Sequence, residues 1–148
     1  MDSMDESERG GAILWIDDDV DLLRQQRFYL EGIGCEVVDI EDVDRAIELI
    51  EQEAEQYCGI ILDCMMSPGK RLRRYDHNAG LRTGLVLLDY LIERGLVQTD
   101  GRPRLFIFTY RIDVNDLRET EQKGFKYHQK QDYPGSKIQE LVREEFDL

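Results

Sequence analysis

The chain has 148 residues, of which 32 are acidic, 19 are basic and 41% are hydrophobic. This length predicts one globular domain with a single core. The net charge of −13 argues against a general affinity for nucleic acid or for an anionic membrane, because both attract basic surfaces. No apolar run approaches the roughly 20 residues that span a bilayer, and no basic-then-apolar leader is seen, so we expect a soluble, cytoplasmic protein. The three cysteines lack CxxC spacing, and we expect them to be reduced packing residues.

Apolar segments of strand length alternate along the chain with segments of helical periodicity. Residues 1–10 carry four acidic side chains and no apolar periodicity, which predicts a disordered acidic tail. The strand-like segments are residues 12–16, 36–40, 59–62, 105–108 and 125–129. The helical segments are residues 20–31 and 43–57, one from about 84 to 94, one from about 113 to 123, and a last one around Ile138, Leu141 and Val142.

This alternation of five strands and five helices predicts an α/β fold, with a parallel sheet that has helices on both faces. One domain is expected over residues 11–148. Residues 67–83 interrupt the alternation with Pro68 and five basic side chains, and we interpret them as a basic insertion.

Polar side chains follow the predicted strands at the points where they end. Asp17 and Asp18 follow the first strand, Asp63 the third, Thr109 the fourth and Lys130 the fifth. Because ligands of open parallel sheets bind beyond the carboxyl ends of the strands, we expect these side chains to converge. Three neighbouring carboxylates repel one another unless a cation neutralises them, and hard oxygen ligands favour Mg²⁺.

Such a set of groups suits the transfer of a phosphoryl group onto an aspartate. Asp63 would attack in line as the nucleophile, while Lys130 and the metal would neutralise charge on the phosphoryl oxygens. Thr109 would donate a hydrogen bond to one of those oxygens.

With these residues, the chain resembles the receiver domain of two-component response regulators over about residues 12–146. The resemblance rests on four motifs in the right order and on the right strands. They are Ile13-Leu14-Trp15-Ile16-Asp17-Asp18-Asp19, Ile61-Leu62-Asp63-Cys64-Met65-Met66 with Pro68, Phe108-Thr109, and Gly124 with Tyr127 and Lys130.

The resemblance implies a flavodoxin-like five-stranded parallel sheet with strand order 2-1-3-4-5, and it assigns roles in an Mg²⁺-dependent site. Asp63 would be the phosphoacceptor. Asp18 and Asp63 would bind Mg²⁺ with the backbone carbonyl of Met65, and Asp17 would act largely through water.

The resemblance also implies a switch pair, Thr109 and Tyr127, in which the hydroxyl moves toward the phosphoryl group and the ring turns inward. Without the resemblance, a tyrosine at position 127 is usually interpreted as a half-buried packing residue. Asp19 is interpreted as the N-cap of the first helix. His77 and His128 show no partner pattern that would indicate a metal or phosphohistidine role.

Four features depart from the family pattern. Gln131 replaces the usual proline, which puts the direction of Lys130 in question, and Tyr110 replaces a small residue and is expected to narrow access to the site. Arg111 stands at a position that in this family influences the lifetime of the phosphoryl group. The fourth departure is the insertion: the connection between Met66 and Gly84 is about a dozen residues longer than is usual in the family, and Ser67 precedes the usual Pro68.

The basic residues of the insertion allow two interpretations: a solvated loop, or an element that recognises a partner or folds over the acidic site. On the second interpretation, the residues concerned are Lys70, Arg71, Arg73, Arg74 and Arg82.

The leading hypothesis is a stand-alone receiver that is phosphorylated on Asp63 by a histidine kinase or phosphotransfer protein and signals to an unknown downstream protein. It would act as a stoichiometric phosphoacceptor rather than an enzyme, as a monomer or weak dimer, without nucleic-acid or membrane partners. One alternative is a receiver-like interaction module that is seldom phosphorylated, in view of Tyr110 and Gln131. Another is an Mg²⁺-dependent phosphohydrolase, which is disfavoured because such enzymes need a cap and more chain.

Overall fold

The computed structural model describes residues 11–101 and 103–148, and the predicted tail over residues 1–10 lies outside them. The strands are β1 (Ala12–Ile16), β2 (Glu36–Ile40), β3 (Tyr57–Leu62), β4 (Arg104–Thr109) and β5 (Lys126–Gln129). The α-helices are α1 (Val20–Glu31), α2 (Val43–Glu53), α3 (Thr83–Glu93), α4 (Val114–Gln122) and α5 (Lys137–Phe146). Two short 3₁₀ turns follow α2 and β5, over Ala54–Gln56 and Lys130–Asp132.

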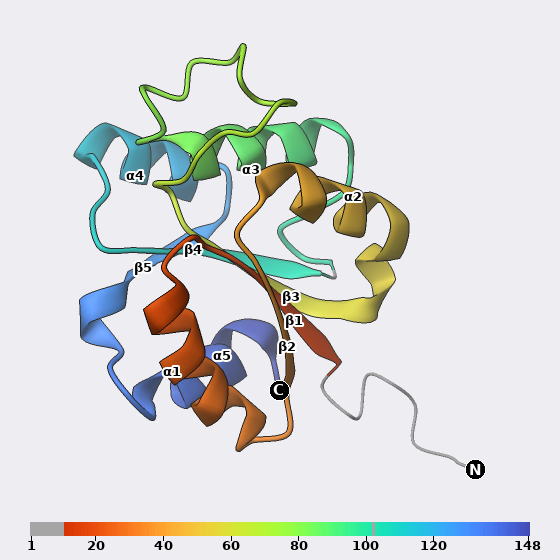
Figure 1. Ribbon diagram of the computed structural model, residues 1–148, viewed down its shortest axis with the longest axis vertical. Coiled ribbons are helices and arrows are strands. Elements are labelled where there is room, and N and C mark those ends of the chain that lie inside the picture. The colour runs from red at the N-terminus through yellow and green to blue at the C-terminus, as the bar shows by residue number, and fades with distance from the viewer. Residues whose placement is uncertain (1–10, 102) are drawn as a thin grey trace.

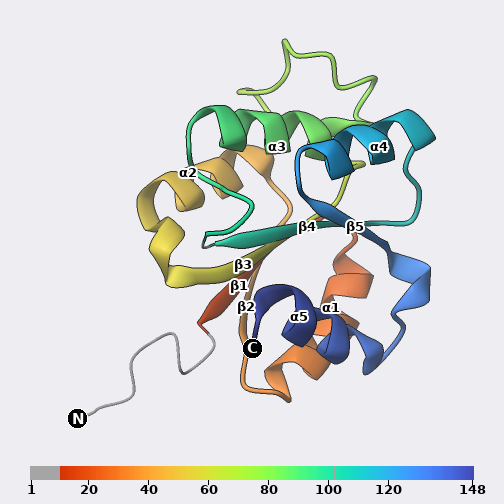
Figure 2. The same ribbon diagram turned by 180° about the vertical axis from the view of Figure 1, so that it is seen from behind.

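The five strands form one parallel sheet in the order β2-β1-β3-β4-β5, which confirms the predicted topology. Helices α2, α3 and α4 cover one face of the sheet, and α1 and α5 cover the other (Figures 1 and 2). No helix among the described residues is both long and apolar enough to span a membrane.

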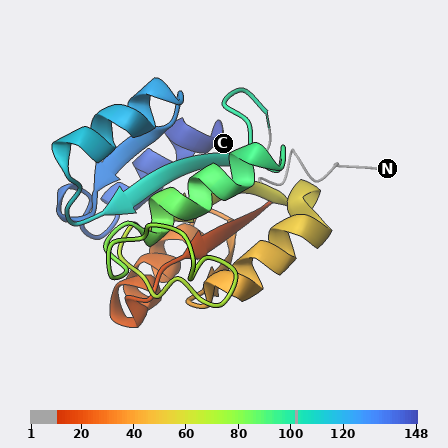
Figure 3. The same cartoon turned by 90° about the horizontal axis from the view of Figure 1, so that it is seen from above.

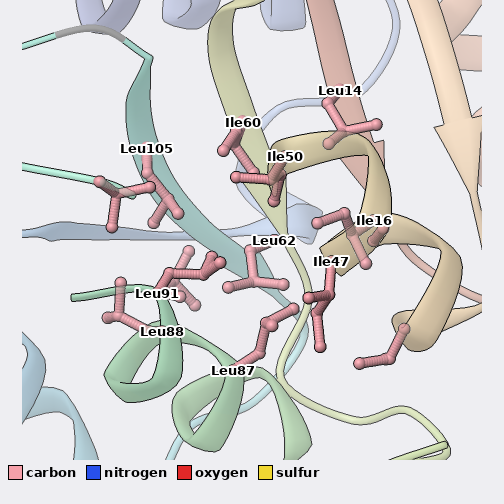
Figure 4. Close-up of a cluster of buried hydrophobic side chains, with 14 of the residues drawn as sticks. Leu14, Ile16, Ile47, Ile50, Ile60, Leu62, Leu87, Leu88, Leu91 and Leu105 are labelled. Carbon is pink, nitrogen blue, oxygen red and sulfur yellow. The ribbon is translucent and has the colours of Figure 1, made fainter. Parts of the chain in front are cut away.

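The first face of the sheet packs against α2 and α3 through aliphatic side chains. Alternate residues of the central strands point to this face, where they meet leucines and isoleucines of the two helices (Figure 4). The labelled members are Leu14, Ile16, Ile47, Ile50, Ile60, Leu62, Leu87, Leu88, Leu91 and Leu105. All ten are buried, so this layer fixes α2 and α3 against the strands.

The second face carries the aromatic part of the core. Trp15, Phe106 and Phe108 point to it from β1 and β4, and Phe146 meets them from α5. Because both faces are buried, the central strands read as continuous apolar runs in the sequence rather than as an alternating pattern. Trp15 belongs to this part of the core, since its side chain is 0% exposed.

The predicted elements are all present, and two of the boundary differences concern buried apolar residues. The helix predicted to run to residue 57 ends at Glu53, and Tyr57 already belongs to β3, where it pairs with Ala12. Phe125, predicted to start the last strand, is buried just before β5. In both places a buried apolar residue lies outside the element that was predicted to contain it, because residue type alone does not fix where an element ends.

Candidate functional site

Two aspartates lie side by side where the central strands β1 and β3 end. Ile16 and Leu62 are partners in the β1–β3 register, and Asp17 and Asp63 follow them directly. The backbone N–H of Asp63 donates to the carbonyl oxygen of Ile16 at 3.0 Å, so the strand pairing continues into the site. Both aspartates are buried, with exposed fractions of 0% for Asp17 and 5% for Asp63. Figure 3 looks down on the face of the sheet that α2, α3 and α4 cover, with the loop of residues 67–82 in front of it.

Lys130 supplies the positive charge that these buried carboxylates need. It follows β5, is 4% exposed, and places its Nζ atom 2.8 Å from Oδ2 of Asp17 and 3.2 Å from Oδ2 of Asp63. Leaving either partner unpaired would cost far more than the pairing gains, so the three side chains act as one unit. Lys130 therefore points into the acidic cluster, although glutamine rather than proline follows it.

The β3–α3 connection is held tightly enough to fix the direction of the Asp63 side chain. The backbone N–H of Cys64 donates to Oδ1 of Asp63 at 2.8 Å, and the N–H of Gly84 donates to the carbonyl oxygen of Cys64 at 2.9 Å. A Cβ atom on Gly84 would overlap the backbone of Asp63, including its carbonyl carbon at 2.8 Å. The start of α3 therefore has to be glycine for the helix to pack directly against the strand end.

The electrostatics of the cluster are unbalanced. Burial, and next the charge of Asp63, raise the pKa of Asp17 from 3.8 to about 7, although Lys130 opposes this. The pKa of Lys130 is raised, because the attraction of Asp17 and Asp63 outweighs the effect of burial. One ammonium does not fully compensate the carboxylates, so the cluster favours an additional cation.

Three carboxylates could hold that cation. Oxygen atoms of Asp17, Asp18 and Asp63 lie within 4.8 Å of one another, with Asp18 exposed to solvent. A site of few carboxylates with one open side suits Mg²⁺, which keeps several of its waters. The side chains present thus fit the expected ion. The contribution of the Met65 carbonyl stays a prediction, and the Met65 side chain itself is exposed.

Binding of Mg²⁺ is expected to change the fluorescence of Trp15, which is the only tryptophan and lies two residues before Asp17. Asp18→Asn should strongly lower the affinity for Mg²⁺, because it removes the charged ligand that is open to solvent. Asp21→Asn, an exposed acidic position in the first turn of α1, is the matched control and should titrate like the parent. Equal midpoints for Asp18→Asn and the parent would place the ion elsewhere.

The remaining predicted site residues surround this cluster. Thr109 ends β4, is 0% exposed, and donates its hydroxyl hydrogen to the carbonyl oxygen of Arg111 at 3.3 Å. Tyr127 lies half-buried in β5 and packs against the aliphatic core, an arrangement that both interpretations of this residue share. The Tyr110 ring lies 5.0 Å from Nζ of Lys130, and Gln131 donates from Nε2 to the Tyr110 carbonyl oxygen at 3.2 Å. The two departures from the family pattern therefore contact each other beside the site.

Other predictions for isolated residues can be placed as well. Asp19 caps α1, accepting a hydrogen bond from the N–H of Leu22 at 3.2 Å, as predicted. His77 is part of the insertion, where its ring contacts the carbonyl oxygen of Arg73 and accepts from the N–H of Gly80. The Nε2 atom of His128 lies 3.0 Å from a carboxylate oxygen of Glu145, which is not a member of the acidic cluster.

The basic residues of the insertion divide into two groups. Arg82 pairs with α4, its Nε lying 3.1 Å from Oδ1 of Asp116. The other four line one cavity together with Tyr90 of α3 and with Arg94, which directly follows α3, and the sequence did not single out either residue. The cavity is lined by Lys70, Arg71, Arg73, Arg74, Tyr90 and Arg94 and contains none of the aspartates. Where these bases form ion pairs among the described residues, their partners are Glu51, Asp116 and Glu119 rather than the aspartates of the acidic site.

Comparison with known proteins gave matches at the level of structure. No family model and no curated protein sequence matches the chain. The BeF3-activated receiver domain of RstA from Klebsiella pneumoniae superposes with a TM-score of 0.66 at 22% identity, over 93% of this chain and 99% of that one. A CheY-like receiver domain protein from Methanospirillum hungatei gives 0.67 at 20% identity, over 93% and 94%. A two-component response regulator from Clostridium difficile gives 0.67 at 20% identity, over 93% and 96%.

These matches and the strand order define the class of fold. The chain has the fold of a response regulator receiver domain, the flavodoxin-like arrangement of CheY-like proteins. The acidic cluster lies at the carboxyl edge of that fold, where the strand ends bring Asp17, Asp63 and Lys130 together.

Proposed function

We propose that the protein is a response regulator receiver that accepts a phosphoryl group on Asp63. The observation that carries this is the buried triad in which Nζ of Lys130 lies 2.8 Å from Asp17 and 3.2 Å from Asp63. A structural ion pair would need one carboxylate for the lysine. Two carboxylates with a third beside them leave a surplus of negative charge that suits a cation and a phosphoryl group.

Each side chain has a separate task in this proposal. A carboxylate oxygen of Asp63 attacks the phosphorus of a phosphohistidine, an O–P bond forms, and the N–P bond breaks with its electron pair returning to the imidazole, which takes up a proton. Lys130 keeps its proton and stays close enough to neutralise charge on the transferred group. Asp17 and Asp18 would hold Mg²⁺, which supplies further charge neutralisation when bound.

Thr109 would donate its hydroxyl hydrogen to the new phosphoryl group after giving up the Arg111 carbonyl, with Tyr127 following it inward. The Tyr110 ring beside Lys130 would shield the aspartyl phosphate from water. The partners in this proposal are a histidine kinase or phosphotransfer protein in the cytoplasm and a downstream protein that recognises the altered surface. The protein would act stoichiometrically, as a stand-alone monomer or weak dimer.

The direct test is incubation with Mg²⁺ and acetyl phosphate, followed by intact-mass measurement. A gain of one phosphoryl group that is lost on treatment with hydroxylamine at neutral pH, which cleaves acyl phosphates, is the expected result. Omitting Mg²⁺ is the control and should remove most of the gain. The absence of both a mass gain and beryllium fluoride binding would contradict the proposal.

A second candidate function is a receiver-like interaction module that is seldom phosphorylated. The observation that favours it is the contact between Tyr110 and Gln131, which places an aromatic ring 5.0 Å from the lysine ammonium. Tyr110→Ala separates the two functions. If the parent is not phosphorylated and the variant is, the ring blocks the site and the module is supported.

A further inference from the structure

A cavity of about 610 Å³ lies between the insertion and the C-terminal half of α3. Figure 1 shows the insertion as the loop that runs above α3, and Figure 3 shows the same loop from above. Five of the six lining residues are cationic and none is acidic; they are Lys70, Arg71, Arg73, Arg74 and Arg94, with Tyr90 as the sixth. We call this the basic cavity. It collects cations at one point of a chain whose net charge is −13.

Specific contacts order the loop that forms one wall of the basic cavity. Leu72 lies between the basic residues and is 0% exposed, so it anchors the loop in the aliphatic core. The carboxylate of Asp44 on α2 accepts hydrogen bonds from the backbone N–H groups of Lys70 at 2.7 Å and Arg71 at 3.0 Å. Arg71 also pairs with Glu51 at 2.9 Å. The loop thus carries its cations on a fixed backbone, which reduces the entropy lost when a ligand binds.

Most of these cations form no ion pair within the part of the chain that the structure describes. Among residues 11–101 and 103–148, Arg71 alone of the five has a carboxylate oxygen within 4 Å. Arg94 is instead held over the Tyr90 ring, its guanidinium carbon 3.5 Å from the ring centroid. Arg82, in the same insertion but outside the cavity, pairs with both Asp116 and Glu119. The unpaired state is therefore a property of the cavity rather than of the insertion as a whole.

We propose that the basic cavity binds a small molecule that carries a chain of two or more phosphate groups. Four of its five cations are arginines, whose planar guanidinium groups bind phosphate oxygens in pairs. The volume lies within the range of about 300–1,000 Å³ that is usual for small-molecule sites. A dense cluster of charge matches a phosphate chain better than an extended acidic segment, because Asp44 and Glu51 lie next to the cavity and would repel charge spread beyond it.

This inference goes beyond the proposed phosphorylation of Asp63, which uses a different part of the surface. Asp17, Asp63 and Lys130 are not among the residues that line the basic cavity, and they pair with one another. Loss of one function therefore leaves the other testable, and Asp63→Asn should bind the phosphate ligand as the parent does.

The test is calorimetric titration with inorganic tripolyphosphate and, separately, with ATP, in EDTA and low salt so that the acidic cluster binds neither probe through a metal. We expect saturable binding of one molecule per chain. Arg73→Gln with Arg74→Gln should weaken it by about tenfold or more, since two charge-assisted contacts are lost. Equal affinity for the two probes would assign recognition to the phosphate chain alone, and tighter binding of ATP would assign it to a nucleotide.

The matched control is Arg24→Gln with Arg118→Gln, which removes the same charge from exposed positions on α1 and α4. This control should bind both probes like the parent. An equal loss in the control would reduce the effect to net charge and overturn the proposal. Absence of saturable binding, or tight binding of a single-stranded oligonucleotide or an acidic peptide but of neither probe, would also overturn it.

Discussion

Replacing Asp63 by asparagine is expected to abolish the gain of a phosphoryl group from acetyl phosphate. The amide has no negative oxygen with which to attack phosphorus, and the neighbouring Asp17 is fully buried and paired with Lys130. The variant should still fold, because asparagine has nearly the same shape and Lys130 keeps Asp17 as its partner at 2.8 Å. Intact-mass measurement checks the first expectation, and chemical denaturation checks the second.

Asp100→Asn is the matched control for this variant. Asp100 is exposed in the turn that precedes β4, at the opposite edge of the sheet from the acidic cluster. This control should gain the phosphoryl group to the same extent as the parent. If Asp63→Asn still gains one, the nucleophile is another residue and the proposed function has to be revised.

The fold could be predicted largely from the sequence, because its strands are buried on both faces. Segments such as Ala12–Ile16 and Tyr57–Leu62 then read as short apolar runs, and their alternation with helices favours a parallel sheet. Residue type does not reveal to which of two neighbouring elements a buried apolar residue belongs. Tyr57 was assigned to a helix for this reason, whereas it pairs with Ala12 in the sheet.

The acidic cluster was also predictable, since each member directly follows a strand and parallel strands end at one edge. The direction of the Lys130 side chain was not predictable. A glutamine at position 131, where proline is usual, does not determine the rotamer of the preceding lysine, which is set by the contacts with Asp17 and Asp63. The basic cavity was only half predictable. Tyr90 and Arg94 lie in and just after the helix that follows the insertion, and the sequence does not show that this helix runs beneath the loop.

The metal-free protein is expected to lose stability as the pH rises from about 4 to 7, through the titration of Asp17. Burial and the charge of Asp63 raise the pKa of this carboxyl from 3.8 to about 7 in the folded protein. In this window the folded chain keeps a proton that the unfolded chain has released, so raising the pH favours unfolding. A shift of about three units corresponds to a loss on the order of 4 kcal/mol across the window, at about 1.4 kcal/mol per unit.

Asp17→Asn isolates this contribution, because the amide does not titrate and leaves Asp63 to pair with Lys130 at 3.2 Å. The difference in unfolding free energy, variant minus parent, should therefore grow in favour of the variant from pH 4 to pH 7 and then level off. Asp100→Asn should follow the parent at every pH. Saturating Mg²⁺ should flatten the parent's curve, since a bound cation favours the charged form of Asp17. A difference curve that is flat over this range without metal would show that Asp17 is already ionised beside Lys130 at pH 4, and the expected pH dependence would then be wrong.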